Sequence, residues 1–146
     1  RGTSMNPTLN NNDKMLVSGL FYEPKVGDVV VFKKDEYDPE RALVKRVIAT
    51  EGQVINMDFD HGIVYVDGVP IEEDYIMEPT TNKIDFIGPQ TVPEGCVFFM
   101  GDNRTGSYDA RSWKEPYIPV GNVRSHVMLC VSVLKGNSWR GICAVS

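Results

Sequence analysis

Residues 42–50 read Ala-Leu-Val-Lys-Arg-Val-Ile-Ala-Thr, an apolar and partly β-branched run that carries two adjacent bases. Such a composition is typical of a β-strand. Side chains alternate along a strand, so Lys45 and Arg46 should point to opposite faces of the sheet. One of the two bases must therefore point toward whichever face is buried, and that position calls for a chemical explanation.

Working outward, further segments also have strand character. They are residues 26–33, 54–58, 63–66, 97–100 and 123–134. Asp60-His61-Gly62 and Asp67-Gly68 have the composition of hairpin turns. No segment of a dozen residues shows a sustained apolar stripe at the helical period, although residues 4–9 have room for one short helical turn. The sequence predicts an all-β, mainly antiparallel fold, built as a folded-over sheet or barrel.

Composition limits the classes of protein to consider. The chain has 146 residues, 24% of them charged, with a formal net charge of -5, which fits one globular domain and excludes a disordered tail or a coiled coil. No clustered basic run is present, so nucleic acid is not expected as a partner. The longest nearly apolar stretch, residues 127–134, is far shorter than the roughly 18 residues that span a bilayer.

Cysteine and histidine give no pattern of a metal site. Cys96, Cys130 and Cys143 form no Cys-x-x-Cys pair, and either one disulfide with one thiol or three thiols is compatible with the sequence. His61 lies in a predicted turn, and His126 has no carboxylate nearby in sequence. The sequence therefore predicts no metal site and favours neither histidine as a catalytic base.

The two ends of the chain differ from the middle. Arg1 runs directly into a dense motif at residues 2–9, so we expect a fragment whose N-terminal portion is missing. We expect one domain over residues 1–134, followed by a C-terminal tail, residues 135–146, that matches no motif. Residues 33–41 and 71–83 are charged or acidic and rich in turn residues, which is typical of solvated connections.

Ser4 and Lys45 are the candidate reacting groups. Ser4 lies in a Gly-Thr-Ser-Met-x-Pro turn, which can present a hydroxyl beside free backbone N–H groups. A serine that only caps a local turn explains the same residues. Burial of Lys45 would lower its pKa and make the neutral amine a competent base for a serine hydroxyl. The alternative is a lysine at the sheet edge whose amine extends to water.

A third segment, residues 100–113, is unusually polar for a stretch that follows an apolar strand. It reads Met-Gly-Asp-Asn-Arg-Thr-Gly-Ser-Tyr-Asp-Ala-Arg-Ser-Trp. Asp109 and Arg111 can form an ion pair within this loop. The composition indicates either a rigid polar scaffold at a site or a solvated surface turn.

Taken together, these segments resemble the type I signal peptidases, a family of Ser/Lys proteases. The matching boxes, in the order of the family, are Ser-Met-x-Pro-Thr-Leu at residues 4–9, Gly-Asp-x-Val-x-Phe at 27–32, Lys-Arg-Val at 45–47 and Gly-Asp-Asn-Arg-x-x-Ser-x-Asp-x-Arg at 101–111. Four boxes in order make the resemblance specific. It implies the all-β catalytic fold of that family and no cofactor.

The resemblance also implies roles for individual residues. Ser4 would be the nucleophile and Lys45 the general base, and Ser107 would hydrogen-bond and orient the lysine amine. Asp109 and Arg111 would form the salt bridge that holds Ser107, with Asp102 and Arg104 as scaffold in the same loop. The substrate-binding residues would be Gly2, Thr3, Met5, Ala42, Leu43 and Val44, against which an extended peptide would lie by strand addition.

The implied function is removal of signal peptides from secreted preproteins at the extracytoplasmic surface of the cell membrane, with an N-terminal anchor that this chain lacks. The resemblance leaves the oligomeric state open. Two positions depart from the family. Gly2 stands where relatives often carry Ser or Thr to assist the oxyanion hole, and Ala110 stands where they often carry Ser.

Two other functions fit parts of the sequence. A LexA-type autoprotease shares the Ser/Lys dyad, but the Gly-Asp-Asn-Arg loop and the Ser-Met-x-Pro box argue against it. A noncatalytic β-rich relative, such as a pilus-assembly factor, would be expected to lack Ser4 or Lys45, and both are present.

Overall fold

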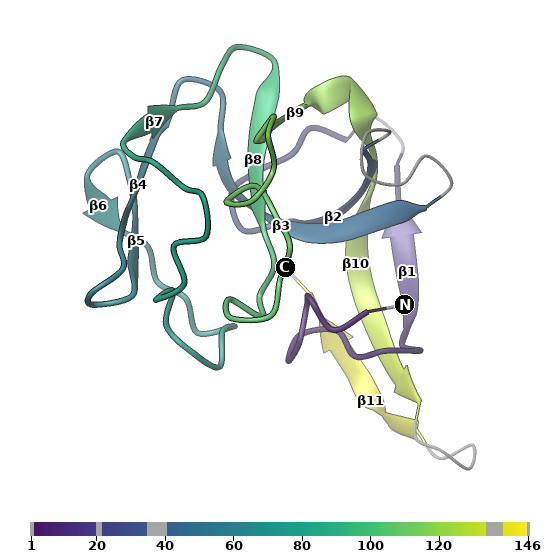
Figure 1. The fold of residues 1–146 in the computed structure, drawn as a ribbon. Helices are drawn as coiled ribbons and strands as arrows, with labels where there is room; N and C mark the ends of the chain where they lie inside the picture. Colours follow the sequence, from purple (N-terminus) through teal and green to yellow (C-terminus); the bar gives the residue numbers. More distant parts are fainter. Residues whose placement is uncertain (1, 20–21, 35–40, 134–138, 146) are drawn as a thin grey trace.

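A computed structural model describes residues 2–19, 22–34, 41–133 and 139–145. The described residues form two antiparallel sheets, and their regular elements are strands apart from one short 3-10 helix. Figure 1 shows the larger sheet beside the N-terminal segment and the smaller sheet on the far side of β8. The predicted all-β, antiparallel fold is confirmed.

The larger sheet has seven described strands and the smaller sheet four. In the larger sheet the order is β1 (Lys14–Ser18), β10 (Val123–Val133), β2 (Val29–Lys33), β3 (Ala42–Thr50), β8 (Cys96–Met100) and β9 (Tyr117–Pro119), with β11 (Trp139–Ala144) paired to β10. In the smaller sheet it is β6 (Val69–Pro70), β5 (Ile63–Val66), β4 (Val54–Asp58) and β7 (Gln90–Thr91). The 3-10 helix spans Val120–Asn122.

Most of the predicted strands are present. The bounds of β3, β4 and β5 coincide with the predicted runs, whereas β2 begins at Val29 rather than Val26. Strands β1 and β9 were not predicted. Within the predicted C-terminal tail, residues 139–144 form β11, antiparallel to the end of β10, while the predicted domain boundary at residue 134 lies outside the described residues.

The buried apolar residues form two clusters, and the smaller one holds the turn that carries Ser4. The larger one lies between the sheets and contains stacked aromatic rings such as Phe32 and Phe99, whose centroids are 4.5 Å apart. The smaller one contains Met5, Leu9, Val29, Val127, Cys130 and Val145. Because Met5 and Leu9 are buried in the smaller cluster, the turn segment that holds Ser4 is fastened to β2 and β10.

Within the described part of the chain, no helix is long and apolar enough to cross a bilayer.

Residues 4–9, where we predicted one helical turn, consist of turns with a single i to i−4 bond, from Leu9 N to Met5 O (2.9 Å).

Candidate active site

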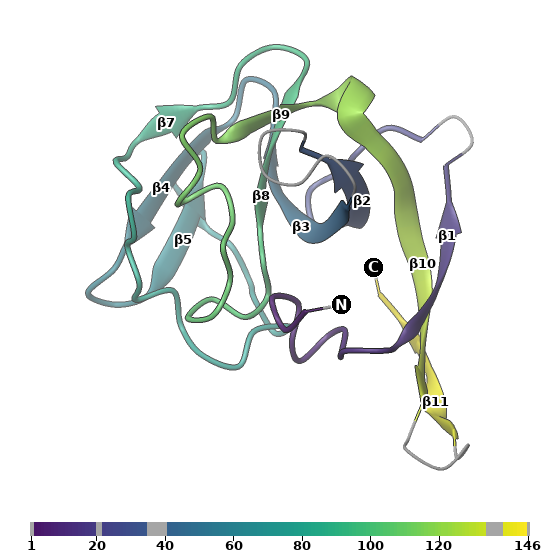
Figure 2. The same cartoon turned by 45° about the vertical axis from the view of Figure 1, so that its right-hand side comes forward.

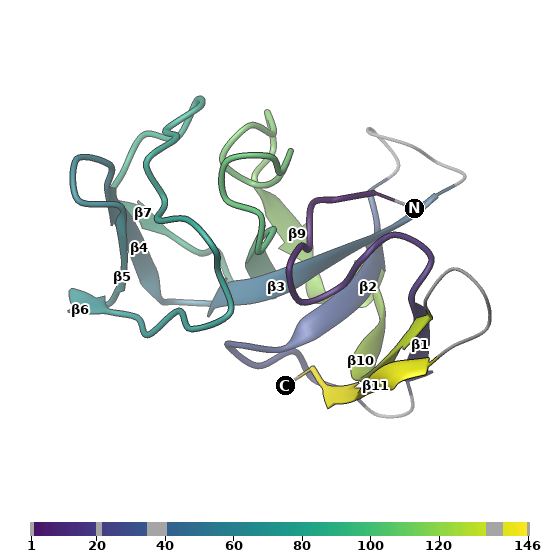
Figure 3. The ribbon, with the colours of Figure 1, turned by 90° about the horizontal axis from the view of Figure 1, so that it is seen from below.

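The Ser4 turn lies against the loop that follows β8. Asn103 N donates to the carbonyl oxygen of Ser4 (3.0 Å), and Asn103 Nδ2 donates to that of Thr3 (3.1 Å). Figure 2 shows the N-terminal segment beside the end of this loop, and Figure 3 shows it crossing near β3. Residues about 100 positions apart in sequence therefore fix the backbone on which the Ser4 hydroxyl is carried.

Lys45 reaches the Ser4 hydroxyl. Lys45 Nζ donates to Ser4 Oγ (2.7 Å) and to the carbonyl oxygen of Val44 (3.1 Å), and the lysine is only 3% exposed. A partner 41 residues away in sequence has thus been brought within hydrogen-bond distance. This is the geometry that a nucleophile and its base require.

Burial sets the titration of Lys45. Desolvation lowers the pKa of Lys45 from 10.5 to about 8, and the negative charges of Asp109 and Asp102 oppose this shift. A large fraction of the amine is consequently neutral at mildly alkaline pH, as a general base requires. The alternative of a lysine extended to water does not agree with its burial.

Ser107 lies in the site, but its predicted hydrogen bond to Lys45 is not formed. Its side chain is buried, and Ser107 Oγ has no hydrogen-bond partner among the described residues. Gly101 separates it from the turn that holds Ser4: a Cβ at position 101 would lie 2.2 Å from Ser107 Oγ and 2.4 Å from Ser4 O. Glycine is thus required where the two segments meet.

The predicted ion pair between Asp109 and Arg111 is present and fully buried. Arg111 Nε and Nη2 donate to the two carboxylate oxygens of Asp109 (2.9 Å each). Asp109 Oδ2 also accepts from Gly101 N (3.0 Å). The pair therefore holds Gly101, the residue in contact with both Ser107 and Ser4.

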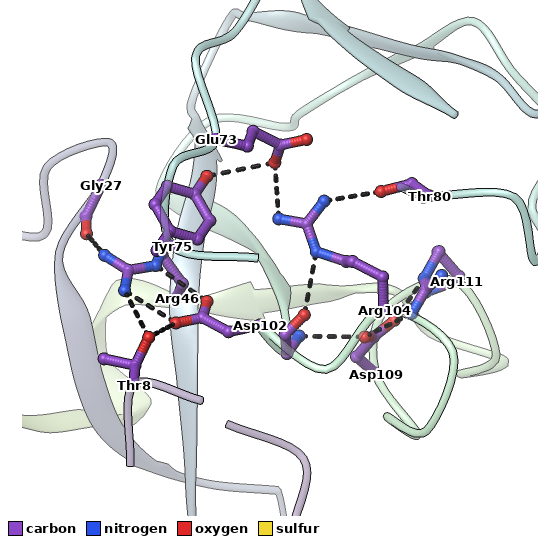
Figure 4. A network of polar contacts seen from close by, with 11 residues as sticks. Thr8, Gly27, Arg46, Glu73, Tyr75, Thr80, Asp102, Arg104, Asp109 and Arg111 are labelled. Atoms are coloured by element: carbon purple, nitrogen blue, oxygen red, sulfur yellow. Dashed lines mark hydrogen bonds and ion pairs between the residues drawn. The ribbon is translucent and has the colours of Figure 1, made fainter. Parts of the chain in front are cut away.

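Asp102 binds the second base of β3. Arg46 Nε and Nη2 donate to its carboxylate (2.8 and 2.7 Å), Arg46 Nη1 donates to the carbonyl of Gly27 (2.6 Å), and Thr8 Oγ1 donates to Asp102 (Figure 4). Arg46 is 4% exposed. Both adjacent bases of β3 are therefore buried, where alternation alone required only one of them to be.

Arg104 extends the network to residues 71–83, which sequence analysis placed among solvated connections. Arg104 donates to Glu73 Oε1 (2.6 Å) and Thr80 Oγ1 (2.8 Å), both buried, and to the carbonyl of Gly101 (2.9 Å). The ring of Tyr75 lies 3.9 Å below the Arg46 guanidinium. Most of residues 71–83 are exposed and outside the strands, as predicted, but Glu73 pairs with the buried Arg104 and so gives part of the segment a structural role.

A cleft of about 150 Å³ opens beside Ser4 and Lys45. Of the predicted substrate-binding residues, Gly2, Met5, Ala42, Leu43 and Val44 line it, and Thr3 does not. Sequence analysis missed the other lining residues, Leu9, Asn10, Asn11, Asn12, Asp13 and Met15. Their position directly after the Ser4 motif was the signal that could have indicated them.

One edge of β3 is open along the cleft. Residues 42–44 pair with β2 on one side, while β8 pairs with β3 only from Arg46 onward. Among the described strands, no second partner covers residues 42–44. Such an edge offers backbone donors and acceptors to an extended peptide.

Both histidines have partners away from the cleft. His61 is exposed and bonded to Asp58 (2.7 Å), and the ring of His126 stacks on Tyr22 with centroids 5.0 Å apart. The part of the chain that the structure describes contains no group of three His, Cys, Asp or Glu residues that could hold a metal ion. Cys96 is a free thiol, and the register places Cys130 opposite Cys143 on β11.

Comparisons with known proteins identify the family of this chain. Residues 1–132 match the family model described as signal peptidase, peptidase S26. A probable signal peptidase I-1 of Synechocystis is 40% identical over 134 residues, covering 86% of this chain and 65% of that protein. The thylakoidal processing peptidase 1 of Arabidopsis thaliana is 33% identical, covering 83% of this chain and 37% of that protein. The chain thus spans less than two thirds of either relative.

A solved structure supports the same conclusion. The crystal structure of a signal peptidase I from Enterococcus faecalis V583 superposes with a TM-score of 0.58 at 25% identity, covering 72% of this chain and 97% of that one. The family model covers nearly the whole chain, including Ser4, Lys45 and the loop after β8. The chain therefore belongs to the signal peptidase family, peptidase S26.

Proposed function

We propose that this chain is a serine endopeptidase that removes N-terminal signal peptides from secreted preproteins, with Ser4 as nucleophile and Lys45 as general base. The observation that carries the proposal is the 2.7 Å contact between Lys45 Nζ and Ser4 Oγ in a buried setting. The lowered pKa of Lys45 supports it, because only a neutral amine can accept the hydroxyl proton.

The proposed reaction has two stages. Neutral Lys45 accepts the proton of Ser4 as its Oγ attacks the scissile carbonyl carbon, and the protonated amine then gives this proton to the leaving nitrogen of the peptide. In the second stage Lys45 takes a proton from water as the water oxygen attacks the carbonyl carbon of the Ser4 ester; the bond from this carbon to Ser4 Oγ then breaks, Lys45 returns the proton to Oγ, and the signal peptide leaves with a free carboxylate. The backbone N–H of Ser4 is the proposed oxyanion donor.

The loop after β8 is proposed to position Ser4 and Lys45. Asp109 and Arg111 fix Gly101, which contacts Ser107 and the Ser4 carbonyl, while Asp102 and Arg104 fix the rest of the loop. Ser107 Oγ is buried and has no partner among the described residues, so it is available to bond the lysine amine when substrate binds. Hydrogen bonds at catalytic centres often tighten only in the complex.

Substrate would bind as an added strand. The open edge of residues 42–44 can pair with the peptide backbone, and the narrow cleft favours small side chains such as Ala ahead of the cut. The proposed place of action is the extracytoplasmic surface of the membrane, reached through an N-terminal anchor. A signal peptide contains an apolar segment, so its cleavage site is expected close to that surface.

The test is cleavage of a purified preprotein, with the new termini mapped by mass spectrometry. The chain should cut once, after a small residue, and Ser4→Ala should abolish cleavage while the fold is retained. Ser125→Ala, a serine on β10 outside the cleft, is the matched control and should cleave as wild type does. Turnover by Ser4→Ala would remove Ser4 from the mechanism, and cleavage within the chain itself would indicate an autoprotease.

A further inference from the structure

The ring of Tyr75 lies against two buried arginines, Arg46 and Arg104. The guanidinium carbon of Arg46 is 3.9 Å from the Tyr75 ring centroid, and that of Arg104 is 5.9 Å away. Tyr75 Oη donates to Glu73 Oε1 (3.1 Å), which also accepts from Arg104 Nη2 (2.6 Å). Figure 4 shows the ring over Arg46, with Glu73 of the same loop reaching Arg104.

The ring has an electrostatic effect on both arginines. The negative face of an aromatic ring attracts a guanidinium, most strongly where water is excluded, and the attraction is stronger for Arg46, which is the nearer of the two. Tyr75 therefore favours the orientation in which Arg46 keeps both its bonds to Asp102. The ring also covers part of the Arg46 guanidinium, which is 4% exposed.

Those bonds matter for Lys45 because Asp102 is one of the two anions that raise its pKa. Among the charged groups, Asp109 and Asp102 of the loop after β8 act on the pKa of Lys45, and Asp13 lines the same cleft. The charged partners of this network are Arg46 of β3, Arg104 and Arg111 of the loop after β8, and Glu73 of the loop after β6. Each of the two anions, Asp102 and Asp109, is bound bidentately by an arginine. Only while these pairs hold are the anions largely neutralised.

We propose that Tyr75 is a positioning residue of the active site: its ring holds Arg46 on Asp102, and thereby keeps the Lys45 amine in its neutral, proton-accepting form. The inference rests on the proposed role of Lys45 as general base. Loss of the ring would admit water and loosen the Arg46–Asp102 pair. Both changes favour the charged form of Lys45.

The experiment follows the titration of Lys45 directly. Chain labelled with ¹³C and ¹⁵N in lysine is titrated by NMR, and the Lys45 signal is assigned by its loss in Lys45→Met. In Tyr75→Leu we expect the Lys45 titration to move up by ~0.5–1 pH unit. The acidic limb of kcat/KM should move by the same amount, so activity falls about 3- to 10-fold at neutral pH and little above pH 10.

Two variants separate the ring from the hydroxyl and from general damage. Tyr75→Phe keeps the aromatic face and should titrate within ~0.2 pH unit of wild type. Tyr65→Leu removes a tyrosine from β5, in the smaller sheet, and should change nothing. If Tyr75→Leu fails to fold, Tyr75→Met fills the space with an unbranched chain and takes its place.

The outcomes are distinct. A folded Tyr75→Leu or Tyr75→Met protein in which Lys45 titrates as in wild type overturns the inference, as does a loss of activity that is equal at every pH. If Lys45 shifts as expected but no preprotein is cleaved by wild type, the proposed function fails while the control of Lys45 by Tyr75 stands.

Discussion

Lys45 and Arg46 are neighbours on β3, yet their surroundings are opposite in kind. Lys45 Nζ bonds a neutral hydroxyl and a backbone carbonyl, at Ser4 and Val44. Arg46 bonds a carboxylate with two nitrogens, a carbonyl with the third, and lies on an aromatic ring. Both are buried to nearly the same degree. Burial alone therefore does not determine what a base does.

The difference teaches how a reactive amine is made. An ion pair would hold Lys45 in its charged form. Among the described residues its amine has no carboxylate partner and bonds only Ser4 Oγ and the Val44 carbonyl, so desolvation can lower its pKa. The anions of Asp102 and Asp109 are needed to build the loop, and each is paired with an arginine, which cannot lose its proton. Lys45 can titrate near pH 8 because the carboxylates of Asp102 and Asp109 are each paired with an arginine.

The largest effect should come from making the two positions alike. Lys45→Arg keeps a cation at position 45 but supplies no base that titrates, so we expect no cleavage at any pH. Lys83→Arg, the same change at an exposed position, should leave the rate unchanged. The measurement is preprotein cleavage from pH 6 to 10.5, and turnover by the Lys45 variant at any point would exclude the dyad.

Breaking the paired side should cost stability. Asp102→Asn leaves Arg46 buried without its anion, and we expect the free energy of unfolding to fall by about 3–5 kcal/mol. Removal of the anion should also lower the pKa of Lys45 further, which moves the acidic limb to lower pH. Denaturant unfolding measures the first effect. Asp58→Asn, which breaks an exposed pair with His61, is the control and should be neutral.

The smallest effect is expected for replacement of the two histidines, which should leave the pH dependence of kcat/KM unchanged. Because burial holds the pKa of Lys45 at about 8, kcat/KM should rise with pH up to about 8 and level off above it. Replacing His61 and His126 together by Gln should leave this limb in place. A limb that disappears in the double variant would assign the titration to a histidine, and the contrast between Lys45 and Arg46 would lose its catalytic meaning.

Local pattern sufficed for part of this description. Strand β3 was predicted to the residue, because its apolar run is visible without tertiary contacts. The Ser4–Lys45 contact was predicted from the family resemblance, since nothing within either segment indicates the other. Strand β1 was missed because its consecutive Met15, Leu16 and Val17 are all exposed: it is defined by pairing with β10 rather than by a buried face.

The loop after β6 shows why the rest was out of reach. Glu73 and Tyr75 lie in a stretch whose composition is typical of a solvent-exposed loop. Glu73 nevertheless binds Arg104, 31 residues further along the chain, and the Tyr75 ring contacts Arg46. Only the folded chain shows that the charges of Glu73 and Arg104 neutralise each other. Ser107 is the reverse case: its place in the site was predicted, but its position is set by the contact with Gly101, which no sequence spacing reveals.

The open edge of β3 also bears on self-association. Unpaired strand edges are the usual templates for edge-to-edge aggregation, and proteins protect themselves by keeping such edges short or covered. Here the opening is limited to residues 42–44, and it lies in the same cleft as Asn10–Asp13. A second copy of the chain would need a longer flat edge to extend the sheet. An opening of three residues can pair with only a short stretch of an added strand, which limits edge-to-edge association at this place.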